Sequence, residues 1–146
     1  MSRVSWLVST CLVVGACSTS APRSSTPVGN QASAPPPGIE HWTGTGREIA
    51  DGTEWTMDLV FDASAPVGAH VGTIAYPSLH CSGELTREPD RGDDLVAREA
   101  ITINLDHLCA DGGAMIIPRH RGATFHWRWQ FAGGSDGAAA TLSRTR

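Results

Sequence analysis

The feature that most restricts the fold of this chain is a two-residue alternation of large apolar and polar side chains. It is clearest between residues 125 and 131, where the apolar members are Phe125, Trp127, Trp129 and Phe131. Successive side chains of a strand point to opposite faces, so the pattern predicts a β-strand with one buried face. No segment of the sequence shows a convincing 3.6-residue period, which would indicate an amphipathic helix.

Seven further segments are predicted to be strands, each bounded by Gly, Pro, Ser or Asp clusters. They are residues 42–48, 55–62, 71–76, 81–87, 95–101, 114–117 and 139–144. Residues 89–94 and 111–113 are examples of the predicted loops between them. About eight sequential strands with one apolar face each can close on themselves, which removes exposed sheet edges. We therefore predict an all-β domain, a small antiparallel up-and-down β-barrel, with a two-sheet β-sandwich as the alternative.

The N-terminus has the three-part layout of a secretory signal peptide over residues 1–16. Arg3 supplies the positive charge, residues 4–14 are apolar, and Gly15 and Ala16 are small. The apolar stretch is shorter than the roughly 20 residues that a membrane-spanning helix needs. A plain secretory signal is one interpretation of this segment.

The run from Val14 to Cys17 resembles a lipobox, the cleavage motif of bacterial lipoproteins. The resemblance implies a diacylglycerol thioether on Cys17, cleavage before it and acylation, for example by palmitate, of the new amino terminus. Several acyl chains together make a stable membrane anchor. Because Ser18 and not an aspartate follows Cys17, we expect a cell-envelope protein held in the outer membrane if the organism has one.

The segment 17–38 is rich in Ser, Thr, Pro and Ala and contains almost nothing that a core could bury. We predict that it is a disordered tether. This leaves residues 39–146 for the β domain, about 105 residues and therefore one small core.

Cys81 and Cys109 are the two cysteines of the β domain, and a secreted chain folds in an oxidising compartment. We predict a disulfide between them. The alternative is a metal site that also uses His80 and His107. Adjacent strand residues point to opposite faces, so His80 and Cys81 do not easily converge on one ion. We therefore expect no metal.

The tryptophans and the single tyrosine of the domain could line the mouth of a barrel and stack on a ligand. We take Trp42, Tyr76, Trp127 and Trp129 as candidate ligand-binding residues. The alternative is that these side chains form the core, because a domain of this size needs large groups to bury enough surface.

The motif formed by residues 72–79 and 81–85, GTIAYPSL and CSGEL, carries a resemblance to a known group of proteins. It is similar to the central motif of a family of small secreted bacterial β domains, which also occur as the extracytoplasmic part of some bacterial protein kinases. The similarity extends over nearly all of residues 42–144. It implies a β fold and an extracytoplasmic location, and the family carries no established activity.

Charge and motifs exclude several classes of function. The net charge is −4 and the chain contains no lysine and no polybasic patch, so we expect no nucleic-acid partner. Ser78, His80 and Ser82 are close in sequence and Asp106 lies beside His107, but no nucleophile elbow or other catalytic motif surrounds them, so we interpret them as turn and hairpin residues. We predict no enzyme activity and no cofactor.

The preferred hypothesis is a lipid-anchored, non-catalytic binding module. Its partner would be a small molecule or glycan inside the barrel, or a protein at its surface. The alternative is an inhibitor of an envelope-active enzyme such as a lysozyme or protease. A binding module predicts a concave pocket with aromatic side chains at one end, whereas an inhibitor predicts a closed interior and a protruding loop at residues 89–94 or 119–122. A structural role in the envelope without a defined ligand is a further possibility.

Overall fold

The computed structural model describes residues 38–145. The predicted signal peptide, Cys17 and the predicted tether up to residue 37 lie outside the described residues. Among residues 38–145, no helix has the length and apolar character needed to cross a membrane.

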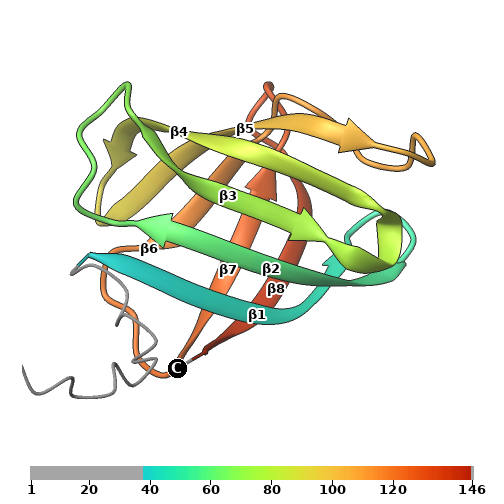
Figure 1. Cartoon of the computed structure of the whole chain (residues 1–146), viewed down its shortest axis with the longest axis horizontal. Coiled ribbons are helices and arrows are strands. Elements are labelled where there is room, and N and C mark those ends of the chain that lie inside the picture. Colours follow the sequence, from blue (N-terminus) through green and yellow to red (C-terminus); the bar gives the residue numbers. More distant parts are fainter. Residues whose placement is uncertain (1–37, 146) are drawn as a thin grey trace, which may run out of the picture. The chain divides into compact units, whose positions relative to one another are not determined.

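The domain is a closed antiparallel barrel of eight strands, each hydrogen-bonded to the next along the chain, with β8 pairing back onto β1 (Figure 1). The strands are β1 (Ile39–Glu48), β2 (Glu54–Asp62), β3 (His70–Tyr76), β4 (Cys81–Arg91), β5 (Asp94–Asn104), β6 (Ala114–Pro118), β7 (Thr124–Gln130) and β8 (Asp136–Arg144). A short 3-10 helix, η1 (Pro77–Leu79), joins β3 to β4. The predicted barrel is confirmed, and the sandwich alternative is wrong because β1 and β8 close the sheet.

The apolar alternation places the core as expected. In β2 and β7 every second side chain is buried, and the polar residues between them face outward. The inward side chains of all eight strands form one hydrophobic cluster. A single core therefore fills most of the barrel and fixes the register of each strand, because a one-residue slip would expose its buried set.

Two strand boundaries differ from the prediction. Residues 89–94, expected to be a loop, lie mostly in the β4–β5 hairpin, where Arg91 pairs with Asp94 across a two-residue turn. Gly92 takes a positive φ of 62° in that turn, and the register shifts between Glu88 and Arg91, which accommodates Pro89 without a ladder hydrogen bond. Phe131, expected on the buried face of β7, lies beyond its end and is exposed.

The barrel has two ends of different character. The closed end is where β1 begins, β8 finishes and residues 63–69, 92–93 and 119–123 connect strands. The open end carries the connections 49–53, 105–113 and 131–135, together with η1. Up-and-down topology places these two sets of connections at opposite ends, as the hairpin turns in Figure 1 show.

Large side chains fill the closed end. The indole of Trp42 packs edge-on against Phe125, with ring centroids 4.7 Å apart, and the Arg144 guanidinium lies 4.9 Å from the Trp42 ring centroid. The Arg121 side chain is almost fully buried and donates two hydrogen bonds to Glu40, of 2.9 and 3.0 Å. Charge pairing over an aromatic layer therefore closes this end.

Candidate ligand-binding cavity

A cavity of about 310 Å³ lies at the open end. Its inner walls are Trp55, Tyr76, Glu99, Trp127, Trp129 and Ala138. Its outer walls come from the connections of the open end and the strand ends beside them, namely Glu48, Ile49, Ala50, Leu79, Leu108, Cys109, Ala110, Phe131, Asp136 and Gly137. Eight-stranded barrels are either filled by their own side chains or leave room for one small ligand. This barrel is filled at one end and hollow at the other.

The cavity brings together three of the four predicted ligand-binding residues. Tyr76 lies at the end of β3, and Trp127 and Trp129 lie on the inward face of β7. Trp42 does not join them, because it lies near the start of β1 and therefore at the closed end. Trp55, at the start of β2, completes the aromatic wall, with its ring centroid 6.4 Å from that of Tyr76 and the two planes at 70°.

Glu99 is the polar centre of the cavity wall. It sits on the inward face of β5 and is only 2% exposed. The Tyr76 hydroxyl donates a 2.7 Å hydrogen bond to Oε1, and the Trp129 indole N–H donates a 2.7 Å hydrogen bond to Oε2. Each carboxylate oxygen therefore holds one donor from the aromatic wall and keeps further acceptor capacity.

Burial raises the pKa of Glu99 above its ordinary value of 4.5, and the negative charge of Asp111 adds to the rise. The hydrogen bonds from Tyr76 and Trp129 oppose this rise without cancelling it. Burial also raises the pKa of Tyr76, and the adjacent Glu99 carboxylate raises it further. Tyr76 therefore stays protonated and remains a donor at neutral pH.

Glycines make room for the tryptophan rings. A Cβ atom on Gly113 would lie 1.9 Å from Cε2 of Trp129, and one on Gly46 would lie 2.7 Å from Cε2 of Trp55. Both indoles therefore approach glycine backbone closely at the open end. Any larger residue at these positions would push an indole toward the cavity or out of the wall.

Two indole N–H groups at the cavity have no acceptor. Trp55 Nε1 and Trp127 Nε1 are buried and have no hydrogen-bond partner among residues 38–145. A buried donor without an acceptor costs free energy, of the order of 1–3 kcal/mol. Buried polar groups without a partner are uncommon in folded proteins, and an ordered water can supply the missing acceptor.

The charges that line the cavity all have one sign. Glu48 and Asp136 lie on its outer wall and Glu99 on its inner wall, and the lining contains neither arginine nor histidine. Around the mouth, the side chains of Ile49, Leu108 and Phe131 are exposed to solvent. The open end is therefore apolar, aromatic and negatively charged.

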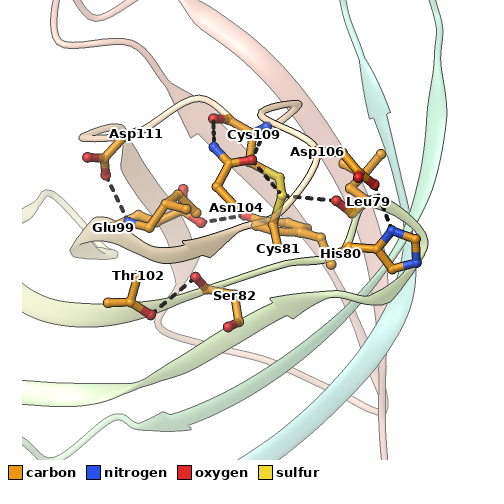
Figure 2. The surroundings of a disulfide bond; sticks show 12 residues. Leu79, His80, Cys81, Ser82, Glu99, Thr102, Asn104, Asp106, Cys109 and Asp111 are labelled. Atoms are coloured by element: carbon orange, nitrogen blue, oxygen red, sulfur yellow. Dashed lines mark hydrogen bonds and ion pairs between the residues drawn. A yellow bond between two sulfur atoms is a disulfide. The ribbon is translucent and has the colours of Figure 1, made fainter.

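The predicted disulfide is confirmed and lies at the mouth. Cys81 at the start of β4 is bonded to Cys109 in the β5–β6 connection (Figure 2). The Asn104 side chain donates to the Cys109 carbonyl at 2.9 Å, and its own oxygen accepts from the Cys109 backbone N–H at 3.3 Å. Bonded to each other, the two sulfurs are no longer thiolates that could bind a metal.

The residues considered for hydrolysis lie outside the cavity lining. The His80 ring contacts the Asp106 carboxylate, Nδ1 to Oδ2, at 2.7 Å in an exposed pair. The Ser78 hydroxyl accepts a 3.0 Å hydrogen bond from the Thr56 backbone N–H. Within residues 38–145, no serine or threonine hydroxyl is hydrogen-bonded to His80.

Sequence reasoning did not single out Glu99 as a site residue, although the signal was present. Leu95, Ala97 and Glu99 share the inward phase of β5, so a carboxylate follows two apolar groups on the buried face. Carboxylates are almost never fully buried without a reason, and one that breaks an apolar phase indicates a site.

Comparisons with protein-family models, with curated proteins and with solved structures find no match to the chain.

Proposed function

We propose that the protein is a lipid-anchored, non-catalytic binding module of the cell envelope, whose barrel takes up a small molecule at its open end. The observation that carries the proposal is the cavity of about 310 Å³ walled by Trp55, Tyr76, Trp127 and Trp129 around Glu99. Ligand sites are concave and mostly apolar, with a few convergent polar groups, and this cavity has that composition.

The composition of the wall favours a small, largely apolar molecule over a glycan. A sugar offers many hydroxyl groups, each of which needs a partner when it is buried. Here Tyr76 and Trp129 already donate to Glu99. The polar groups that remain, the two unpartnered indole N–H groups and the acidic side chains, are few beside the aromatic and aliphatic surface. Stacking surface is abundant and hydrogen-bonding capacity is limited.

The same features favour a binding module over an enzyme inhibitor. An inhibitor predicts a filled interior and a free protruding loop, whereas this barrel is hollow at one end. The two candidate inhibitor loops are tied to the closed end and to each other, because Arg119 pairs with Asp90 and Arg121 pairs with Glu40.

The Cys81–Cys109 disulfide supports the envelope location, because disulfides are stable in an oxidising compartment and rare elsewhere.

Ligand uptake is tested with N-phenyl-1-naphthylamine, a neutral probe whose fluorescence rises in apolar surroundings. We expect the full chain to bind it and Ala138→Phe to lose binding at least tenfold, because the Ala138 side chain faces the cavity. Ala139→Phe is the matched control, since the next residue of β8 is exposed on the outer face. Equal binding by both variants, or no binding by the unaltered chain, contradicts the proposal.

The anchor is tested by metabolic labelling with a palmitate analogue in cells that express the chain or Cys17→Ala. We expect label in the unaltered protein and none in the variant. Equal incorporation in both would remove the lipid anchor from the account.

A further inference from the structure

The charges and rings of the cavity narrow the chemistry of its ligand. We propose that the cavity binds an organic cation, an alkylated ammonium group carried on an apolar body, with the ammonium held by Glu99 inside the aromatic wall. This inference rests on the proposed function and adds the ligand's class to it.

The first support is the sign of the charges. Glu99, Glu48 and Asp136 are the charged residues of the lining, and all are acidic; Asp136 is paired with Arg128 at 3.7 Å, whereas Glu99 has no ion-pair partner among residues 38–145. Neither of the hydrogen-bond donors to Glu99, Tyr76 and Trp129, is a cation. A buried carboxylate is ordinarily paired with a positive charge. Here that charge can come from the ligand.

The second support is the shape and chemistry of the walls. Four aromatic side chains line the cavity together with the carboxylate, and Trp55 packs edge to face with Tyr76, the two planes at 70°. The faces of tryptophan and tyrosine rings attract cations, and desolvated rings attract them most strongly. An alkylated ammonium combines a positive charge with apolar surface that an aromatic wall can bury.

The third support excludes an inorganic cation. Among residues 38–145, no three acidic, histidine or cysteine side chains come together in a group that could hold a metal ion. Calcium and magnesium require about six or more oxygen ligands, and a wall of indole rings does not supply them. The surroundings of the Glu99 carboxylate therefore suit a bulky organic cation better than a metal ion.

The apolar side chains around the mouth suit the apolar body of the proposed ligand. Ile49, Leu108 and Phe131 are exposed around the mouth and continue the apolar wall outward. A chain or ring attached to the ammonium would lie against these side chains. The ligand is therefore expected to be amphipathic, with its charged group innermost.

The test is calorimetric titration of the full chain with three probes that share a hexyl chain. They are hexyltrimethylammonium, 1-hexanol and hexyl sulfate. We expect the cation to bind at least tenfold more tightly than the alcohol, and the sulfate to bind more weakly than the alcohol. Binding of the alcohol or the sulfate as tight as that of the cation overturns this inference and leaves the proposed function standing.

Failure of the two proposals is distinguishable. If the cation does not bind and N-phenyl-1-naphthylamine does, the ligand class is wrong and the cavity remains a binding site. If neither binds, both proposals fall.

Variants locate the charge that is responsible. Glu99→Gln keeps the size of the side chain and removes its charge, so we expect the affinity for hexyltrimethylammonium to fall at least tenfold more than the affinity for 1-hexanol. Asp58→Asn is the control, because Asp58 is exposed on the outer face of β2 and the change in net charge is the same. Unchanged affinity for the cation in Glu99→Gln overturns the assignment.

A second variant avoids disturbing the interior. Glu48 lies at the exposed mouth, so Glu48→Gln should leave folding unaffected. We expect this variant to lose cation affinity twofold to threefold at low salt, and the loss to disappear at high salt. An equal effect on hexyl sulfate and on the cation would contradict an electrostatic contribution.

Discussion

At the scale of single residues, Glu99 links the fold to the proposed binding site. Its burial among aromatic rings is unfavourable for an ionised carboxylate, and its hydrogen bonds to Tyr76 and Trp129 offset only part of that cost. A residue that lowers stability and lies in a cavity is typical of a site retained for binding.

This residue predicts a pH dependence of stability. Because the pKa of Glu99 is raised in the folded state, the native protein holds this proton more tightly than the unfolded chain does. The contribution of Glu99 is therefore full below pH 4.5 and is lost as the pH rises through the raised pKa, so the free energy of unfolding falls over that window. Each tenfold difference between the acid dissociation constants of Glu99 in the folded and unfolded states changes the free energy of unfolding by about 1.4 kcal/mol.

The measurement is urea unfolding of the unaltered chain and Glu99→Gln between pH 4 and pH 8. Above pH 4.5 we expect a steeper fall in the unaltered chain than in the variant. Carboxylates whose pKa is lowered, such as Glu40 and Asp90, lose their contribution to stability only as the pH falls below their ordinary pKa values. They do so equally in both proteins and therefore cancel in the difference between the two profiles. Identical pH profiles would show that Glu99 does not carry this cost.

Gly113 gives a second prediction at the same scale. A methyl group there would overlap the indole of Trp129, which is buried and cannot move freely. We expect Gly113→Ala to lower the free energy of unfolding by about 1–3 kcal/mol and to weaken probe binding. Gly133→Ala, where nothing lies within 4 Å, is the control and should change neither. The explanation fails if the two variants behave alike.

At the scale of elements, the alternating pattern in β2 and β7 and the turn-residue clusters that bound the other segments predicted all eight strands. Neither signal placed the strand ends. β4 and β5 continue through residues 89–94 because a bulge and Gly92 let the hairpin turn in two residues. β7 stops at Gln130, and Phe131 folds back to pack edge-on against Trp129, with centroids 4.8 Å apart.

The disulfide is the element-scale feature that secures the mouth. It ties the start of β4 to the long β5–β6 connection and closes a loop over a sequence separation of 28 residues. On the chain-entropy model, a loop of this length contributes about 3.5 kcal/mol. We expect the double variant Cys81→Ser with Cys109→Ser to lose about that much stability in urea unfolding. A loss below about 1 kcal/mol would mean that the connection is held chiefly by Asn104 and its hydrogen bonds.

At the scale of the whole molecule, alternation of strand direction divides the aromatic side chains between two ends. Trp42 and Trp127 carry the same sequence signature, yet Trp42 helps to close one end while Trp127 lines the cavity at the other. The sequence pattern reports the face on which a side chain lies and not its height in the barrel. The contact of Glu99 with Trp129 joins β5 to β7 across β6, and the pattern within either strand does not reveal it.

The central claim is that a small molecule occupies the open end, and the indole N–H signals in a ¹H–¹⁵N correlation spectrum test it most directly. Trp→Phe variants assign each signal, and 1-hexanol or hexyltrimethylammonium is then added to the full chain. We predict that the signals of Trp55, Trp127 and Trp129 move on saturation while that of Trp42, at the closed end, does not. If the signals of the three cavity indoles all stay fixed, whether or not that of Trp42 moves, the cavity is not the binding site.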